Sequence, residues 1–320
     1  MPSHADADGG ATEEQDALIA ELATLTTEQR AHAGHDLEGQ DTLSLVLAMN
    51  DQDQLVPAAI RQHAHAIAQA VDAITDRLHR GGRLFYLGAG SAGRIGILDA
   101  SECPPTFGTD PSLVVGLIAG GSAAIQSAVE NAEDDDLAAR TALQDRDLAQ
   151  DDVVVGISAS GRTPFVVAGL RYAREVGAFT VSIASNQNSA ISQVAEVALD
   201  VVVGPEFVTG STRLKAGTAQ KLIVNMLSTL SMIKLGKTYQ GVMVDLRATN
   251  KKLHARSVRT VVEVADVDAR TASQTLDDVN GSVKQALLAL LGDVATDHTH
   301  AALLEADGSL RRAIAMAKEG

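Results

Sequence analysis

The chain has 320 residues, a formal net charge of −15 and few aromatic side chains, with five Phe, three Tyr and no Trp. Nucleic-acid binding needs a surplus of Lys and Arg, or aromatic residues interleaved with basic ones, and the sequence offers neither. The single cysteine, Cys103, excludes a disulfide framework and a multi-thiolate metal site. We therefore expect a cytoplasmic protein without a nucleic-acid partner.

No segment of the sequence is typical of membrane attachment. The most apolar long stretch, 221–236, is interrupted by polar residues such as Asn225 and Lys234, which predicts a buried helix rather than a membrane span. Residues 1–16 are polar and acidic, so they predict a disordered tail and no signal peptide. We expect no membrane partner.

The apolar spacing along the chain predicts three further regions. A helical spacing indicates an N-terminal helical region at 17–73. From 74 to 237, short continuous apolar runs alternate with helical stretches, which is typical of a mainly parallel sheet covered on both faces. The predicted fold class is therefore α/β, a three-layer α-β-α sandwich. At 238–320 the alternation is lost, and we expect a small helical C-terminal region.

The individual elements follow from the same patterns, although the strand order does not. The expected strands are 84–87, 113–118, 153–157, 179–183 and 197–203. The expected helices of the α/β region are 92–101, 121–131, 135–149, 163–176, 189–195 and 215–235. The expected C-terminal helices are 257–265, 268–277, 282–291 and 309–318.

The first chemistry-bearing segment is the glycine turn Gly88–Arg94, which follows a strand and opens a helix. It matches the G-x-G-x-x-G pattern of dinucleotide-binding proteins. Such a site also requires an acidic residue at the end of the next strand, which accepts hydrogen bonds from the ribose hydroxyls. That strand ends in Leu117–Gly121 without a carboxylate, so we do not expect a dinucleotide cofactor.

A second glycine turn, 156–164, repeats the first. A shift of 68 residues superposes Gly88 on Gly156 and Gly93 on Gly161, which predicts the same strand–turn–helix device twice. Such turns point free backbone N–H groups and the positive end of a helix at one spot. The turns also carry the hydroxyl groups of Ser91, Ser158, Ser160 and Thr163. Together these donors predict a phosphate site for a small ligand, the alternative being that the hydroxyls only cap helices.

A third helix start and two carboxylates complete the candidate residues. Ser211 and Lys215 precede or begin the long apolar helix and are further candidate ligand contacts, unless Ser211 only caps that helix. Glu102 lies before a proline pair, where we expect the helix to end and the helix dipole to disfavour a carboxylate. Glu133 lies in an acidic loop, where a solvated side chain is the alternative.

Cysteine and histidine suggest no further chemistry. No histidine partner for Cys103 is identifiable, so we expect a buried or idle thiol rather than a nucleophile. The pairs His63/His65 and His298/His300 are two residues apart, and such residues on a helix face away from each other. We therefore predict no metal site.

Four segments closely resemble the N-acetylmuramic acid 6-phosphate etherase family: 88–108, 156–170, 208–227 and 243–258. The motif DASECPPTFG at 99–108 is highly specific, and the resemblance runs from about Leu18 to the C-terminus. It implies the sugar isomerase (SIS) fold, a C-terminal piece similar to a ubiquitin-associated domain, and a homodimer.

The resemblance also implies an activity. The family removes the D-lactyl ether from C3 of its amino-sugar phosphate, giving N-acetylglucosamine 6-phosphate and D-lactate in cell-wall recycling, without metal or nucleotide. By resemblance, Glu102 matches the acid that protonates the departing lactate and Glu133 matches the second catalytic glutamate, which we assign as the base. The alternative is a non-catalytic sugar-phosphate sensor similar to glucokinase regulatory protein.

Two departures from the family pattern bear on the site. The family usually reads GAGTSGR, whereas this chain has Ser91-Ala92, so the hydroxyl expected at Ala92 is missing. The family usually has Ala where this chain has Ser158, and we hypothesise that Ser158 supplies the lost hydrogen bond to phosphate. The segment Thr27–Ala31 also lacks the Asn that the family places after its Arg.

Overall fold

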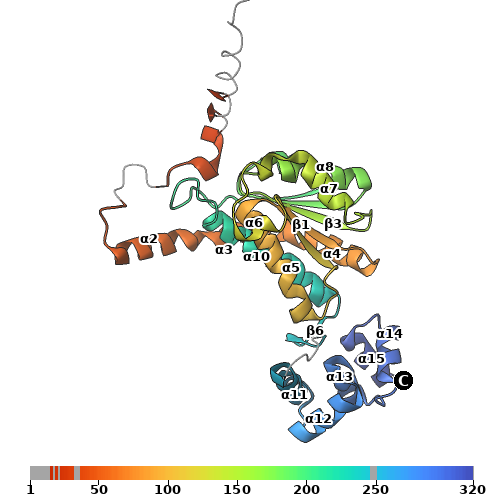
Figure 1. Ribbon diagram of the computed structural model, residues 1–320. Coiled ribbons are helices and arrows are strands. Elements are labelled where there is room, and N and C mark those ends of the chain that lie inside the picture. The colour runs from red at the N-terminus through yellow and green to blue at the C-terminus, as the bar shows by residue number, and fades with distance from the viewer. Residues whose placement is uncertain (1–14, 17–18, 21, 32–36, 246–250, 320) are drawn as a thin grey trace, which may run out of the picture.

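The computed structural model describes residues 15–16, 19–20, 22–31, 37–245 and 251–319 (Figure 1). The predicted disordered tail at 1–16 lies outside these ranges except for Gln15 and Asp16, which are helical. Among the described helices, none combines the length and the apolar character that crossing a bilayer requires.

The core of the molecule is a parallel sheet of five strands in the order β2-β1-β3-β4-β5. The strands are β1 (Leu84–Gly88), β2 (Val114–Ile118), β3 (Val153–Ile157), β4 (Phe179–Ala184) and β5 (Val197–Asp200). Every residue of β1 and β3 is buried, as expected for central strands covered on both faces. The five predicted strands are confirmed, although β5 ends at Asp200, where its partner β4 also ends.

Helices cover both faces of the sheet, so the predicted three-layer α/β fold is confirmed (Figure 1). One face packs against α4 (Ala64–His79), α5 (Gly90–Phe107) and α10 (Lys215–Lys234), and the other against α7 (Asp136–Gln144), α8 (Pro164–Val176) and α9 (Ala190–Val194). The apolar side chains of the strands point alternately into these two layers. Three further elements precede these helices in the chain, η1 (Thr26–Glu28), α2 (Thr42–Asp53) and α3 (Leu55–Arg61), and Figure 1 shows α2 projecting away from the sheet.

Several predicted helix bounds were wrong: α7 ends at Gln144, α11 (Lys251–Ala265) begins before residue 257, and two larger differences concern α5 and the predicted helix at 121–131. Helix α5 does not stop before the proline pair but continues to Phe107, and Gly108 (φ 63) donates its N–H to Pro104 O. Proline in the last turn removes only the amides that would bond one turn back, so the helix survives there. The predicted helix at 121–131 is reduced to α6 (Ala123–Gln126), because Ser127 adopts an extended conformation (φ −133, ψ 150). The short η2 (Ala132–Asp134) follows, after Asn131 with a left-handed φ of 59.

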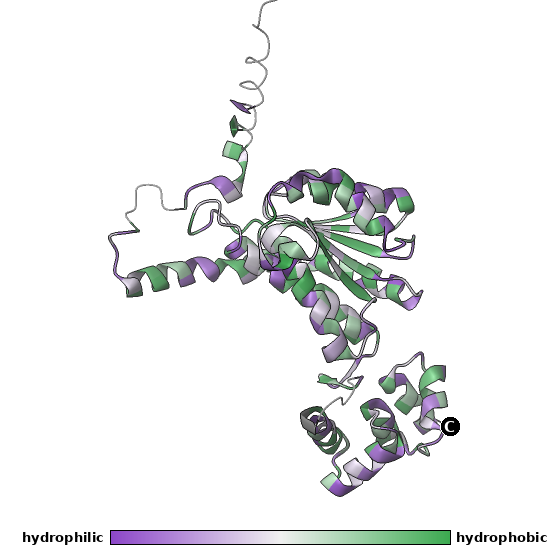
Figure 2. Ribbon diagram, in the orientation of Figure 1, coloured by the Kyte–Doolittle hydropathy of each residue, from purple (hydrophilic) through white to green (hydrophobic). Residues whose placement is uncertain are grey.

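The apolar stretch forms a helix, as predicted, but only one side of that helix is buried. Helix α10 buries one side against the sheet, where residues such as Ile223 and Leu227 are fully buried. Its other side exposes Met226, Leu230 and Ile233 to solvent. Figure 2 shows apolar residues on the helices as well as in the strands between them. The described residues of one chain therefore leave one apolar face of this helix uncovered.

The C-terminal residues form a separate helical core. Its helices are α11 (Lys251–Ala265), α12 (Ala269–Asp278), α13 (Val283–Gly292), α14 (Thr299–Glu305) and α15 (Leu310–Glu319), of which α14 was not predicted. A two-residue hairpin, β6 (Thr238–Tyr239) with β7 (Val242–Met243), precedes them and was also missed. Lys284 ties this core to the end of the hairpin through Asp245 Oδ2 at 2.7 Å. The domain boundary at 237/238 stays a prediction.

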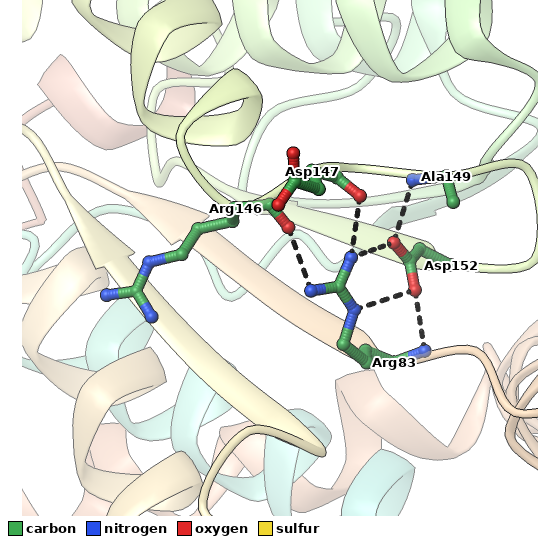
Figure 3. Close-up of polar contacts among 5 residues, drawn as sticks. All are labelled: Arg83, Arg146, Asp147, Ala149 and Asp152. Atoms are coloured by element: carbon green, nitrogen blue, oxygen red, sulfur yellow. Dashed lines mark hydrogen bonds and ion pairs between the residues drawn. The ribbon is translucent and has the colours of Figure 1, made fainter.

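One ion pair fixes the amino ends of the two central strands (Figure 3). Arg83, before β1, donates from Nη2 to Oδ2 of Asp152 at 2.7 Å and from its backbone N–H to Oδ1 at 2.7 Å. The buried Asp152 carboxylate also accepts from the N–H of Ala149, and the guanidinium bonds the carbonyls of Arg146 and Asp147. The two strands are thus held in register at the end opposite their glycine turns.

Candidate functional site

A cavity of about 300 Å³ opens at the carboxyl ends of β1 and β3. In the strand order 2-1-3-4-5 this is the point at which the order reverses, where parallel α/β sheets bind ligands. The wall is formed by Glu28, Ala89, Gly90, Ser91, Ala92, Glu133, Ser158, Ala159, Ser160, Thr163, Gly210, Thr212 and Gln220. The four hydroxyl residues of the predicted phosphate site and Glu133 therefore lie around one cavity.

The turn after β1 offers backbone donors. Helix α5 begins at Gly90, and its N-cap residue Ala89 has no side chain to accept from the first amides. Those N–H groups and the positive end of the helix therefore face the cavity. Glycine is required where the helix passes the strand, because a Cβ at Gly93 would lie 2.6 Å from Ile118 Cγ1 and 2.8 Å from Gly88 O.

The turn after β3 offers hydroxyl groups held in a network. The buried Ser158 Oγ lies 2.8 Å from Thr163 Oγ1 and 3.3 Å from Ser160 Oγ, and it accepts from the N–H of Gly161 at 3.0 Å. Ser160 Oγ in turn accepts from the N–H of Arg162 at 3.3 Å. The network fixes the loop before any ligand arrives.

Both turns follow a strand and precede a helix, as predicted, but the helix begins at a different point in each. Helix α5 starts at Gly90, so Gly93 lies inside it, whereas α8 starts only at Pro164, and the aligned Gly161 (φ 73) lies in the loop before it. Proline at the first helical position explains the difference, because it forces Thr163 before it out of the helical region (ψ 113). The first turn is a helix start and the second is a loop.

An N-terminal segment closes one side of the cavity. Asn186, which follows β4, accepts from the N–H groups of Thr26 and Thr27 and donates to Thr27 Oγ1 at 3.1 Å. Its Nδ2 also donates to the carbonyls of Ala159 and Ser160. This side chain joins η1 to the second turn and brings Glu28 to the cavity.

The start of α10 differs from the expectation. The buried Glu206 carboxylate accepts from the N–H groups of Lys215 and Ala216, both at 2.9 Å, so this helix start is already capped. Lys215 is buried outside the cavity, with Nζ 2.8 Å from Gln52 Oε1, and burial lowers its pKa. Ser211 does not line the cavity either, but its neighbours Gly210 and Thr212 do.

The two glutamates lie far apart within one chain. Glu133, on η2, lines the cavity described above. Glu102 is exposed near the other end of α5, in a separate cavity of about 630 Å³ with Arg256 and the proline pair. At about 1.5 Å of helix rise per residue, Glu102 lies roughly 16 Å from Ser91 along α5. The structure of one chain does not bring the predicted acid to the predicted base.

A buried carboxylate lies between these two ends of α5. Asp99 accepts from Tyr86 Oη at 2.8 Å, Asn225 Nδ2 at 2.6 Å and Ser228 Oγ at 3.1 Å, and burial raises its pKa. Burial and the nearby Asp99 raise the pKa of the Cys103 thiol to about 12, so it carries almost no thiolate near neutral pH. Asp99 fixes α5 against β1 and α10.

Sequence reasoning assigned no contact to Glu28 or Gln220, which line the cavity. It also missed Asn186, which does not line the cavity but joins η1 to the second turn. The sequence signal for Asn186 was its place two residues after the buried parallel strand β4, whereas Glu28 and Gln220 reach the cavity through tertiary packing. Within the described ranges, no three His, Cys, Asp or Glu side chains gather as metal ligands would.

Comparison with known proteins decides the family. An N-acetylmuramic acid 6-phosphate etherase of Vibrio campbellii is 51% identical over 299 residues, which cover 93% of this chain and 97% of that relative. One of Streptomyces avermitilis is also 51% identical and covers 94% of this chain and 96% of that relative. The chain belongs to the N-acetylmuramic acid 6-phosphate etherase family.

Two segments of this etherase-family protein also match the models of broader domain families. Residues 129–230 match the SIS domain, and residues 66–174 match the glucokinase regulatory protein N-terminal SIS domain. A solved phosphoheptose isomerase from Neisseria gonorrhoeae is 18% identical with a TM-score of 0.45, covering 58% of this chain and 96% of its own. The resemblance read from the sequence motifs is confirmed.

Proposed function

We propose that the protein cleaves the D-lactyl ether of N-acetylmuramic acid 6-phosphate to N-acetylglucosamine 6-phosphate and D-lactate, in amino-sugar recycling. The proposal rests on family membership: relatives named N-acetylmuramic acid 6-phosphate etherase are 51% identical to this chain over nearly its whole length. The same relatives disfavour the alternative of a sensor of the glucokinase-regulator type. A sugar phosphate is therefore the partner that we propose for the cavity.

The phosphate fits between the two turns. The unbonded amides at the start of α5 point at the cavity from one side, and the hydroxyl network of the second turn faces it from the other. Amide and hydroxyl donors at a helix N-terminus bind a dianion without a lysine or arginine. This arrangement accounts for anion binding by a chain with a net charge of −15.

We assign the role of base to Glu133, which lines the cavity. Once the sugar ring opens, C1 is an aldehyde and the C2 proton becomes acidic. Glu133 takes that proton, the C3–O bond breaks, and its electron pair leaves on the lactate oxygen, which a proton must neutralise. The unsaturated aldehyde then takes OH from water at C3 and H at C2, so the product differs from the substrate by exchange of lactate for water. Each such group contributes about 10²–10⁴-fold to the rate.

The proton for lactate must come from another copy of the chain if Glu102 is the acid. Leu98, one turn before Glu102, is 52% exposed, and α10 beside it exposes Met226, Leu230 and Ile233. Helix α2 projects from the body with Leu43, Val46 and Leu47 exposed. We propose a homodimer that covers these apolar surfaces and in which Glu102 of one copy completes the cavity of the other.

Lactate release tests the function directly. The purified protein is incubated with N-acetylmuramic acid 6-phosphate and D-lactate is measured. We expect turnover by the wild type and a loss of about 10³-fold in Glu133→Gln, as for removal of a general base. The absence of lactate from the folded wild type would overturn the proposal. Sedimentation velocity tests the homodimer, and cell fractionation tests the proposed cytoplasmic location.

A further inference from the structure

A second cavity of about 220 Å³ adjoins the proposed phosphate cavity. The two share Ala89, Gly90 and Glu133, so they are two compartments with a common wall. Most of the remaining wall is small and apolar, formed by Ala119, Ala124, Ala128, Val129 and Ala132. The compartment therefore fits a short apolar group attached to a ligand whose other end lies in the phosphate cavity.

Arg94 supplies a cation in this second compartment. It is half-buried on α5, one turn after Gly90. Within the described ranges its Nε donates to Ile125 O at 3.0 Å, and no carboxylate pairs with its guanidinium. Among the described residues, no Lys and no other Arg lines either compartment, while Glu28, Glu130 and Glu133 do. The cation that these residues offer to an anion is therefore the planar guanidinium of Arg94, which is suited to a carboxylate.

We propose that this second compartment binds the lactyl group of the substrate, with Arg94 on its carboxylate and the alanine and valine wall around its methyl group. The inference rests on the proposed function. The lactyl ether differs from the product's hydroxyl by just these two features, a carboxylate and a methyl group. Glu133 lines both compartments, which suits a base that acts at C2 while the bond at C3 breaks.

Arg94 also offsets an electrostatic cost. A lactyl carboxylate in this compartment lies among residues that include Glu130 and Glu133, and like charges repel strongly in a partly enclosed site. The guanidinium neutralises the carboxylate in the substrate and continues to hold lactate after the C3–O bond breaks. Arg94 is thus a determinant of specificity for the ether over the product.

A purely structural role for Arg94 predicts something different. Its hydrogen bond to Ile125 O ties α5 to α6, and loss of that tie disturbs the wall for any ligand. Substrate and product then lose affinity together. A lactyl site predicts that the substrate alone loses affinity, because the product has no carboxylate.

The experiment compares two ligands in Arg94→Met, Arg94→Lys and the control Arg171→Met. Arg171 is exposed on α8 and lines neither compartment, so its loss removes the same charge elsewhere. The kcat/KM for lactate release and the competitive inhibition constant of N-acetylglucosamine 6-phosphate are measured for each, and thermal unfolding confirms that each variant folds.

We expect Arg94→Met to lower kcat/KM by about 10- to 100-fold, the value of a charge-assisted hydrogen bond. In Arg94→Met the inhibition constant of the product changes by less than about 3-fold. The kcat/KM of Arg94→Lys lies between those of the wild type and Arg94→Met, and Arg171→Met has the same kcat/KM and inhibition constant as the wild type. Equal losses for substrate and product, or an unchanged kcat/KM, would overturn the lactyl site. A wild type that releases no lactate would instead overturn the proposed function, so the two failures are distinguishable.

Discussion

The turns after β1 and β3 lie side by side at the carboxyl ends of adjacent strands, yet they present donors in different ways. The first is a helix start whose amides are uncapped, and the second is a loop held by three hydroxyl groups. The first depends on glycine to bring the helix close to the sheet, whereas the second depends on side chains. Two turns of similar sequence thus present two different kinds of donor to one cavity, which we propose as the phosphate site.

The largest expected effect comes from the close packing of the first turn. Gly93→Ala puts a methyl group 2.6 Å from Ile118 Cγ1 and 2.8 Å from Gly88 O, so something must shift. We expect the free energy of unfolding to fall by about 3 kcal/mol, as for overpacking of a tight interior.

Urea unfolding of Gly93→Ala and of Gly217→Ala checks this prediction. Gly217 is a helical glycine in α10 at which a Cβ would meet its nearest neighbour at an ordinary 3.4 Å. We expect that control to be neutral or slightly stabilising. Equal stabilities for the two variants would show that the first turn does not depend on close approach.

The next effect comes from the opposite end of the same strands. Arg83→Met leaves the buried Asp152 carboxylate without its cation. We expect a loss of about 2 kcal/mol, below the value for a fully buried pair because Arg83 is partly exposed. The KM of the folded enzyme is expected to stay within about 2-fold, since the contact is remote from the turns. A KM that rises with the loss of stability would mean that the turns depend on strand register.

A smaller effect, on KM, is expected to differ between the hydroxyl groups of the two turns. Ser158→Ala removes the acceptor of the Gly161 N–H and the partner of Thr163. We expect KM to rise about 10-fold, the value of one to two hydrogen bonds. Ser91→Ala is expected to change KM by less than about 3-fold, because the first turn binds through its amides. A reversed order of the two effects would contradict the difference between the turns.

A rescue variant tests the hypothesis that Ser158 replaces the hydroxyl missing at Ala92. Ala92→Ser is added to Ser158→Ala, and KM is measured again. Because Ser158 is engaged within its own loop, we expect the added hydroxyl to recover less than half of the lost affinity. Full recovery would mean that Ser158 acts as a direct phosphate donor and that its network has no separate role.

The smallest effect is expected at Cys103, on the helix that the first turn opens. Burial raises its pKa from 9.0 to about 12, so at pH 8 about 10⁻⁴ of the thiol is ionised in the folded protein. Because the folded state favours the neutral thiol, the raised pKa of Cys103 adds to the free energy of unfolding below pH 9. That contribution is lost as the pH rises through 12. We expect iodoacetamide at pH 8 to label Cys103 only as fast as the protein unfolds. Rapid labelling of the native protein would show that α5 is loosely packed.

The sequence was sufficient to predict the five strands, most helices and part of the cavity wall, namely Glu133 and the four hydroxyl residues of the two turns. Continuous apolar strands and glycine turns are local signals, which is why these features could be predicted. It could not predict that α5 passes its prolines, since that depends on the C-cap at Gly108. It placed Lys215 near the ligand, whereas the buried Glu206 occupies that helix start instead. The distance between Glu102 and Glu133 depends on the direction of α5 across the sheet, which no local pattern specifies.

The central claim is that one active site combines the cavity of one copy with Glu102 of another. Glu102→Gln and Glu133→Gln chains are coexpressed with different tags, and the heterodimer is isolated by two affinity steps. If Glu102 acts across the dimer, one of its two sites is intact, so lactate release is about half that of the wild type, while each variant alone is nearly inactive. A heterodimer as inactive as the two variants would contradict the account.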